Sequence, residues 1–343
     1  MTTFSAPEAE FWPLYKMIDE SLYAPLLVTA VHLEIFDRVC HPSPARDLAV
    51  RTGWHPENTE HFLNALAAVG LLKKKDGAFQ NTAVSRTYLV TGSKNYLGDM
   101  LENCFAMYFQ TPQTMGTLIQ QGPADMSPQT NDKGPDMEAM AAQGIHAQAR
   151  LQLTYAHLVA SIVSDLPEFP GMKRMLDLGG GPGLNCVAIV SAHPCLKGTV
   201  FDFPAVTKKT CDYIRDYGME DRITTLGADF TQGGLGSGYD LILAGGTLNF
   251  SKDLLEPVMA KIYNALSPGG IFISLHDVLT PDGTGPGVSV RRFLPMALAG
   301  EDFYLEAASI ADAMARAGME PVESRKVETS MGPLLLDIGR VPQ

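Results

Sequence analysis

The sequence predicts an α/β fold in which a Rossmann-like sheet at the C-terminus follows a mostly helical, winged-helix domain. Three observations carry this expectation. From residue 172 onward, short apolar strands alternate with amphipathic helices, a pattern typical of a doubly wound parallel sheet. A glycine-rich loop follows the first of those strands and precedes a helix. Before residue 95, short helices lead into a β-hairpin instead.

The composition predicts a globular, cytoplasmic protein without nucleic-acid or membrane partners. Hydrophobic residues make up 45% of the 343 residues and charged residues 19%, enough for a real core. The net charge of -12 repels the phosphate backbones of nucleic acids. No uncharged apolar run reaches the ~18 residues of a membrane span, and the N-terminus lacks a signal-peptide pattern. The five cysteines form no C-x-x-C pair, which predicts neither a disulfide framework nor a metal site.

Residues 1–95 are expected to form a winged-helix dimerisation domain. A short helix over 45–52 and a second helix over 58–69 precede two strands joined by Asp76-Gly77, a dipeptide typical of hairpin turns. A DNA-reading helix carries Arg or Lys toward the groove, whereas the second helix has no basic residue. The order helix, helix, hairpin therefore favours a dimerisation or lid role over DNA binding.

Residues 96–168 are predicted to be a helical linker and substrate-capping region. This segment is rich in methionine and aromatic residues and is divided by a Pro/Gly/Asp-rich stretch over 122–136. Most such side chains belong to a core, although methionine also suits adaptable apolar pockets. We expect some of them to line a ligand cavity.

Residues 169–343 are predicted to be the Rossmann-like domain. Its expected strands lie at 174–178, 198–203, 223–226, 240–244 and 270–275, and near the end at 321–326 and 333–338. Its expected helices lie at 184–192, 206–217, 254–266 and 308–317.

The loop after the first strand has the composition of a cofactor site. Asp177 opens it, and its glycines are Gly179, Gly180, Gly181 and Gly183. Glycines permit a tight turn and close approach of the backbone to a ligand, while the following helix N-terminus presents free N–H groups. The spacing differs from the dinucleotide pattern G-x-G-x-x-G. The leading acid disfavours a pyrophosphate and favours a cationic ligand end, such as the amino group of a methionine moiety.

Two further acids stand at the ends of the next strands. Asp202, followed by Phe203, is placed to bind both hydroxyls of a ribose. Asp229 can accept a hydrogen bond from an adenine amino group while Phe230 covers the ring. Each acid taken alone is also typical of a helix cap or a solvated loop. Three such motifs in chain order predict S-adenosylmethionine as the cofactor.

These motifs resemble those of the S-adenosylmethionine-dependent small-molecule O-methyltransferases that have an N-terminal winged-helix dimerisation domain. The glycine loop 176–183, the segments 201–204 and 227–230, and the turn 266–270 carry a resemblance that spans nearly the whole chain. Relatives of this kind act on hydroxyindoles, caffeate, hydroxyneurosporene and polyketides. The resemblance implies a homodimer and methyl transfer to a small, largely apolar or aromatic acceptor at a hydroxyl, in a pocket capped by the helical region.

The catalytic base of the resembled family is missing. Its members commonly place a histidine after the fourth strand, and this chain has Asn249 there. An amide has no basic lone pair near neutrality, so Asn249 is expected to orient an acceptor without deprotonating it. Methyl transfer gains much of its rate from alignment. An acidic phenol, a thiol, an amine or an enolisable carbon therefore needs weaker help from a base.

Four other side chains are candidates for catalysis. Asp277 matches the acid after the family's fifth strand, and alternation places His276 on the opposite side, against a helix or in catalysis. His146 lies on the expected substrate-lining helix, and Glu301 matches an acid that flanks the family's histidine. A purely structural role is an equal alternative for each.

Other functions stay open at this point. The same fold is compatible with C-, N- or S-methylation, or with a decarboxylase, hydroxylase or cyclase that binds the cofactor without methylating. A winged-helix regulator that senses the cofactor is a third alternative, which the acidic second helix disfavours.

Overall fold

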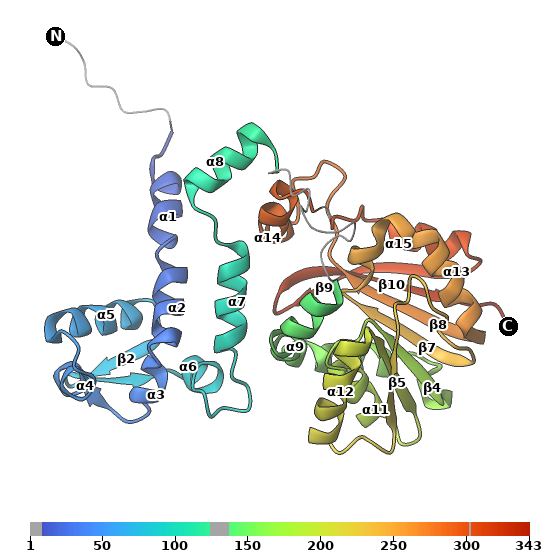
Figure 1. Ribbon diagram of the computed structural model, residues 1–343, viewed down its shortest axis with the longest axis horizontal. Coiled ribbons are helices and arrows are strands. Elements are labelled where there is room, and N and C mark those ends of the chain that lie inside the picture. The colour runs from blue at the N-terminus through green and yellow to red at the C-terminus, as the bar shows by residue number, and fades with distance from the viewer. Residues whose placement is uncertain (1–8, 124–136, 302) are drawn as a thin grey trace, which may run out of the picture. The chain divides into compact units, whose positions relative to one another are not determined.

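The computed structural model describes residues 9–123, 137–301 and 303–343, so most of the stretch over 122–136 lies outside the described residues. The chain divides into two compact units, Met1–Met107 and Tyr108–Gln343 (Figure 1). The boundaries predicted after residues 95 and 168 stay a prediction. In the described part of the chain, no helix is long and apolar enough to cross a membrane.

The first unit consists of short helices around a small antiparallel sheet. The sheet has the strand order β1-β3-β2, and a turn at Asp76 (φ 51°) and Gly77 (φ 78°) joins β2 to β3, as the sequence predicts. Phe36 and Phe79 are fully buried at the centre of the unit's core. The elements are α1 (Trp12–Glu20), α2 (Tyr23–His32), α3 (Ile35–Arg38), β1 (Ser43–Pro44), α4 (Ala45–Thr52), α5 (Pro56–Ala68), β2 (Leu72–Lys75), β3 (Ala78–Asn81), α6 (Ala83–Tyr88) and α7 (Gly98–Tyr108).

The second unit is built on a mixed seven-stranded sheet. Its strand order is β6-β5-β4-β7-β8-β10-β9. The first five strands are parallel, whereas β10 runs antiparallel to both β8 and β9. The strands are β4 (Arg174–Leu178), β5 (Lys197–Asp202), β6 (Ile223–Gly227), β7 (Tyr239–Gly245), β8 (Leu266–His276), β9 (Val322–Thr329) and β10 (Gly332–Arg340).

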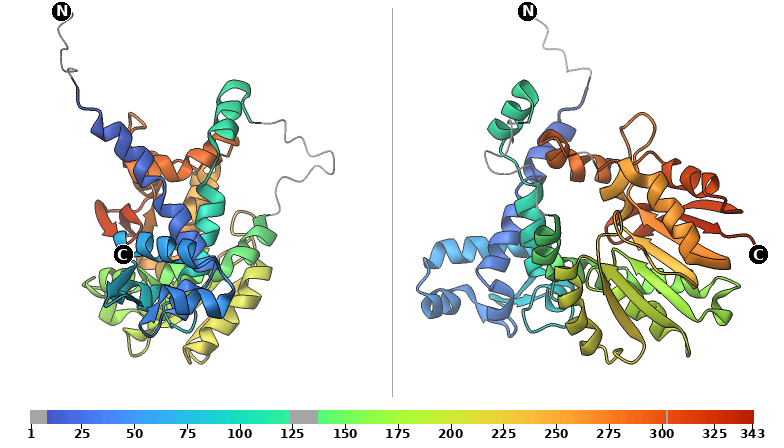
Figure 2. Two further views of the ribbon diagram at one scale, coloured as in Figure 1. Left: turned by 90° about the vertical axis from the view of Figure 1, so that its left-hand side faces the viewer. Right: turned by 45° about the vertical axis from the view of Figure 1, so that its right-hand side comes forward.

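Helices cover both faces of this sheet (Figures 1 and 2). Alternation along β4 sends Met175 into one core cluster, with apolar residues of α10 and α11, and Leu176 into the other, with residues of α13 and α15. The helices of the second unit, not all of which lie on the sheet, are α8 (Pro112–Gln121), α9 (Met137–Leu153), α10 (Ala156–Ser164), α11 (Leu184–Ser191), α12 (Pro204–Asp216), α13 (Leu255–Ala265), α14 (Gly287–Leu298) and α15 (Ser309–Arg316), with short 3-10 segments η1 (Phe169–Gly171) and η2 (Leu248–Leu254).

Two elements of the second unit depart most from the sequence expectations. Strand β8 begins at Leu266 rather than at residue 270, because Leu266 pairs with Tyr239 ahead of an irregularity in the ladder. The sequence does not predict helix α14, because Gly287 begins it and Pro295 lies inside it. Both residue types have low helix propensity.

The contact between β5 and α11 is close enough to exclude a side chain at Gly198. A Cβ there would lie 2.2 Å from the Sγ of Cys186. We expect Gly198→Ala to lower the free energy of unfolding by about 1–3 kcal/mol through overpacking. Gly144→Ala on α9 is the control, because nothing lies within 4 Å of its Cβ and the change favours helix by about 0.5–1 kcal/mol. Urea unfolding followed by circular dichroism measures both, and an unchanged midpoint for Gly198→Ala would contradict the packing.

Candidate functional site

The predicted motif residues gather at one edge of the sheet, where the parallel strands end. Backbone hydrogen bonds tie neighbouring loops together there. Gly180 N donates to the carbonyl of Phe201 at 3.2 Å, and Ala228 N donates to that of Asp202 at 2.9 Å. The loops after β4, β5 and β6 therefore form one continuous surface, as the sequence predicts for strands that run in parallel.

The glycine loop has room for its backbone alone. Gly179 (φ 62°) and Gly181 (φ 56°) adopt the left-handed conformation that favours glycine. A Cβ on Gly179 would lie 2.3 Å from the Oγ1 of Thr247, and one on Gly181 would lie 2.7 Å from the Oε1 of Gln148. Neighbouring elements thus fill the space where side chains would stand, and the loop can keep this tight turn only with glycine at these positions.

Three side chains hold this loop in place. The Oγ1 of Thr247 donates to the carbonyls of Leu178 and Gly179, both at 3.1 Å. Gln152 on α9 donates to the carbonyl of Gly180 at 3.0 Å and accepts from Leu184 N at 3.0 Å. Thr210 on α12 donates to the carbonyl of Gly181 at 2.7 Å. Sequence reasoning missed all three, because contacts between distant elements leave no pattern in the chain.

Asp177 lies buried beneath the loop with half of its carboxylate unsatisfied. Its Oδ2 accepts from Cys186 N at 3.2 Å, while its Oδ1 finds no hydrogen-bond partner among the described residues. Burial raises the pKa of this carboxyl to about 7, and the nearby charge of Asp202 adds to the rise. A buried acid that lacks a partner gains most from a cationic ligand group.

The other two acids are oriented by backbone donors. Asp202 accepts from Gly181 N at 2.8 Å and from Phe203 N at 2.7 Å, and burial raises its pKa above the ordinary value. The Oδ1 of Asp229 accepts from the N and Oγ1 of Thr231 at 2.8 and 2.7 Å. Because each carboxylate oxygen can accept more than one bond, both groups keep acceptor capacity for a ligand.

A tyrosine and an asparagine that the sequence did not single out also belong to this edge. Asn185 is buried, and a Cβ on Gly245 would lie 3.1 Å from its Nδ2. Burial and the charge of Asp177 raise the pKa of the Tyr155 phenol to about 12. Tyr155 therefore stays protonated at neutral pH and is no candidate for a base.

Of the five predicted catalytic residues, Asn249 and Asp277 are brought together. The Nδ2 of Asn249 donates to the carbonyl of Asp277 at 3.0 Å and to that of Phe303 at 2.9 Å. The Oδ1 of Asp277 accepts from Ser289 at 2.9 Å and pairs with Arg292 at 3.3 Å. Arg292 also donates to the carbonyl of Met331. This network fixes the loop after β8 against α14.

The remaining three predicted residues make no hydrogen bond to either of those side chains in the described structure. His276 is buried on the opposite side of β8, 3.0 Å from Ser274 Oγ and 3.5 Å from Asp337 Oδ2, and burial lowers its pKa to about 4. His146 is exposed and its Nδ1 lies 2.5 Å from the hydroxyl of Tyr213. Glu301 is exposed.

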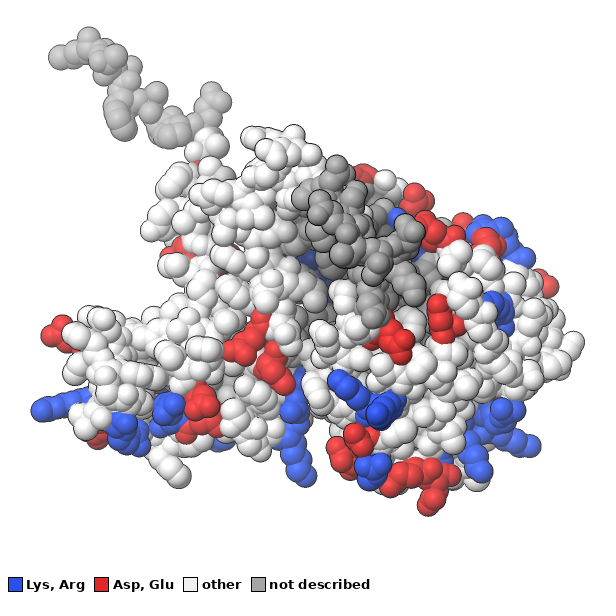
Figure 3. Space-filling view, viewed as in Figure 1, with Lys and Arg blue, Asp and Glu red and all other residues white. Residues whose placement is uncertain are grey.

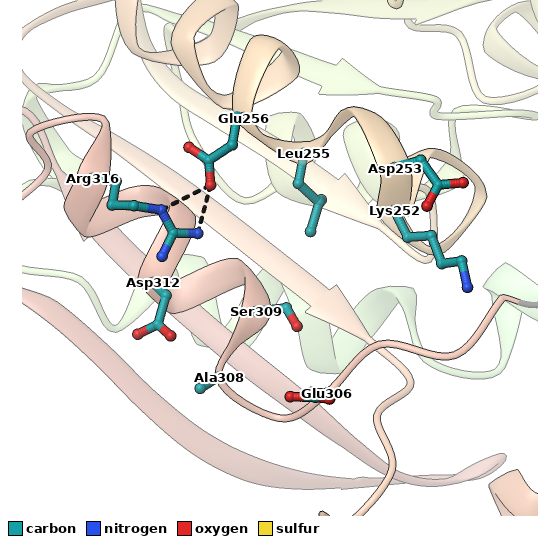
Figure 4. Close-up of a pocket in the computed structure, with 9 residues that line it drawn as sticks. All are labelled: Lys252, Asp253, Leu255, Glu256, Glu306, Ala308, Ser309, Asp312 and Arg316. Carbon is teal, nitrogen blue, oxygen red and sulfur yellow. Dashed lines mark hydrogen bonds and ion pairs between the residues drawn. The ribbon is translucent and has the colours of Figure 1, made fainter.

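Two other surfaces lie away from these loops. A pocket over η2, α13 and α15, crossed by the Arg316–Glu256 ion pair at 2.5 Å, contains none of the predicted site residues (Figure 4). On the face of the molecule in Figure 3, basic and acidic side chains are interspersed. Among the described residues, no group of three or more His, Cys, Asp or Glu could hold a metal ion.

Comparison with known proteins agrees with the geometry. Residues 133–319 match the O-methyltransferase domain, and residues 15–91 match the O-methyltransferase dimerisation domain. A 3-hydroxy-5-methyl-1-naphthoate 3-O-methyltransferase from Streptomyces sahachiroi is 29% identical over 76% of this chain and 75% of its own. The N,N-dimethyltransferase OxyT of Streptomyces rimosus is 26% identical over 82% and 83%. The human N-acetylserotonin methyltransferase, solved in complex with S-adenosylmethionine, shares the fold with a TM-score of 0.77 at 20% identity over 100% of both chains.

The raised pKa of Asp177 predicts that replacing this residue stabilises the fold but weakens binding of the cofactor. The carboxyl has a pKa of 3.8 when unperturbed and about 7 in the fold. Between pH 3.8 and about 7 the folded chain therefore keeps a proton on Asp177 that the unfolded chain has lost. The free energy of unfolding falls as the pH rises through this range. We expect Asp177→Asn to be more stable than the parent at pH 8 by at least about 1 kcal/mol, yet to bind S-adenosylhomocysteine about tenfold more weakly or worse.

Urea unfolding and calorimetric titration at pH 6 and pH 8 measure the two effects. The parent should bind more tightly at pH 8, where Asp177 is ionised, and the variant should lose this dependence. A variant that binds as tightly as the parent at both pH values would contradict a contact between Asp177 and the ligand cation.

Two backbone N–H groups orient the Asp202 carboxylate, and replacing this residue tests whether it binds the ribose. Asp202→Ala removes the proposed ribose acceptor, and we expect the affinity for S-adenosylhomocysteine to fall by about tenfold or more. Asp212→Ala on the exposed face of α12 is the control, because its carboxylate pairs only with Arg215 among the described residues. Unchanged affinity in Asp202→Ala would rule out the ribose assignment.

Proposed function

The chain belongs to the O-methyltransferase family that carries an N-terminal dimerisation domain, and from this membership we propose that it methylates a hydroxyl of a small, largely apolar or aromatic acceptor without a histidine base. S-adenosylmethionine is its cofactor, and small molecules are its acceptors. The observation that carries the proposal is the hydrogen bonding of Asn249.

The residues at the strand ends fit the cofactor. Asp177 would face its amino group, the main chain at Gly179–Gly183 would follow its methionine part, Asp202 would hold the ribose, and Asp229 with Phe230 would hold the adenine. When bound, S-adenosylmethionine supplies a methyl group that is already activated for transfer by its sulfonium charge. What the protein adds is alignment of the acceptor and exclusion of water.

Asn249 can align an acceptor but cannot deprotonate it. Both hydrogens of its Nδ2 are committed to the carbonyls of Asp277 and Phe303 at 3.0 and 2.9 Å, which fixes the orientation of the amide. Its Oδ1 is then the open position, and an amide oxygen accepts a hydrogen bond from a hydroxyl. The acceptor hydroxyl would dock on this bond with its proton attached and would release that proton to water before methyl transfer.

The neighbouring groups do not replace the base in this proposal. Tyr155 is held in its protonated form, and the Oδ1 of Asp277 accepts from Ser289 and pairs with Arg292. An acceptor that ionises by itself, such as an acidic phenol, suits a site of this kind because methyl transfer requires little further help from a base.

Aromatic side chains beside Asn249 support an apolar or aromatic acceptor. Phe250 follows it in the chain, is 59% exposed, and its ring centroid lies 4.9 Å from that of Phe303. Phe303 in turn supplies one of the carbonyls that Asn249 binds. The naphthoate acceptor in the name of the Streptomyces sahachiroi relative has the same aromatic character.

Methylation of an amine is the second candidate. An N–H group donates to an amide oxygen as an O–H group does, so the geometry at Asn249 accommodates either. The relative from Streptomyces rimosus is an N,N-dimethyltransferase. Mass spectrometry of products from acceptors that carry both groups distinguishes the two reactions.

The dimerisation domain suggests a homodimer, and we propose that α1 takes part in it. Trp12, Met17 and Ile18 on this helix are 61, 70 and 71% exposed. Apolar side chains exposed in a row mark an interaction surface, and a second copy of the chain is the partner that the domain match supports.

A base-free mechanism predicts how rate depends on pH. With a series of naphthols of graded acidity, kcat/KM should rise with pH up to the pKa of each naphthol and should show no common inflection near ~6.5, the ordinary pKa of histidine. Asn249→Leu should lower kcat/KM by about tenfold or more, through loss of the bond to the acceptor and of the two bonds to the carbonyls of Asp277 and Phe303. Asn264→Leu, on the exposed face of α13, should leave it unchanged. An inflection near that value shared by all naphthols would contradict the proposal.

A further inference from the structure

Lys261 on α13 binds the loop that follows β6. The Nζ of Lys261 donates to the carbonyls of Phe230, Thr231 and Gly233 at 3.1, 2.8 and 3.1 Å. A lysine ammonium has three N–H donors and no acceptor, so this one is fully used by a single loop. We infer that Lys261 is a positioning residue that sets the conformation of Asp229 and Phe230 and thereby the selectivity of the site for a nucleobase with a 6-amino group.

The loop closes around the ammonium because its other polar groups are already engaged. Asp229 accepts from the N and Oγ1 of Thr231 through its Oδ1, and its carbonyl accepts from Gly233 N at 2.7 Å. These bonds fold the chain back on itself, so that the carbonyls of Phe230, Thr231 and Gly233 converge on one point. Among the described residues, Lys261 is the donor that reaches those three carbonyls.

Removing the ammonium would leave three carbonyl oxygens facing one another. Their dipoles repel, and hydrogen bonds to a charged donor are stronger than bonds between neutral groups. The loop would relax by turning carbonyls toward water, and Asp229 and Phe230 would move with it. Asp202 ends β5, which is paired with β6 up to Gly227 ahead of this loop, so Asp202 should keep its position.

Selectivity for the base depends on the direction of the Asp229 carboxylate. Its Oδ2 accepts no hydrogen bond within the described residues and would receive the 6-amino group of adenine. Hypoxanthine carries an oxygen at the same position, which would face the carboxylate without a proton between them. A site that holds a polar partner in register discriminates strongly between such pairs.

The inference rests on the proposed placement of adenine at Asp229, and the experiment tests the two separately. Calorimetric titration of the full chain gives the Kd for S-adenosylhomocysteine and for S-inosylhomocysteine. The parent should prefer the adenosyl ligand. Lys261→Met, which keeps the length of the side chain without donors, should reduce the ratio of the two Kd values by about tenfold or more. Lys261→Gln, which has two donors and no charge, should give a ratio between that of the parent and that of Lys261→Met.

Lys209→Met is the matched control. The Nζ of Lys209 donates to the carbonyl of Ala142 on α9 at 2.8 Å, so this variant also loses an ammonium–carbonyl bond but not at the loop after β6. It should leave the ratio unchanged even where its melting temperature falls. Circular dichroism confirms that each variant is folded before it is titrated.

Two results would overturn the inference. If Lys261→Met and Lys261→Gln weaken both ligands by the same factor, the lysine has only a structural role. If Asp229→Ala also leaves the ratio unchanged, adenine does not bind at Asp229, and the proposed assignment fails before the role of Lys261 is reached. If the ratio falls in Asp229→Ala but not in the lysine variants, adenine binds at Asp229 and only the role of Lys261 is refuted.

Discussion

The site is organised by a stretch of backbone that has no space for side chains. A Cβ at Gly179 or Gly181 would clash with Thr247 or Gln148, and the carbonyls of the loop are held by Thr247, Gln152 and Thr210. These clamps come from three different elements, so the loop cannot shift without breaking contacts to all of them. Such preorganisation reduces the ordering that ligand binding would otherwise require.

Beneath the same loop the protein buries an acid at a cost to its stability. Asp177 has one oxygen without a partner and a pKa raised to about 7, which is unfavourable for an isolated fold at neutral pH. Groups of this kind are typical of functional sites. A cationic ligand end offsets the cost, so the feature that weakens the ligand-free fold is the one that favours the cofactor.

A second fixed network follows β7. Asn249 joins the carbonyls of Asp277 and Phe303, and Asp277 joins α14 through Ser289 and Arg292. The edge of the proposed acceptor region is thereby fixed by neutral and paired groups. This arrangement is consistent with chemistry that depends on alignment more than on proton transfer.

The sequence by itself determined the order of strands and helices, the glycine loop and the acids at Asp177, Asp202 and Asp229, because each depends on local spacing and on the parallel direction of the strands. It could not indicate Gln152, Tyr155, Asn185 or Lys261, whose partners lie on other elements. It also left His276 open as a catalytic candidate, whereas the fold places it 3.5 Å from Asp337. Only the tertiary structure decided these contacts, because hydrogen bonds between segments distant in the chain depend on packing rather than on periodicity.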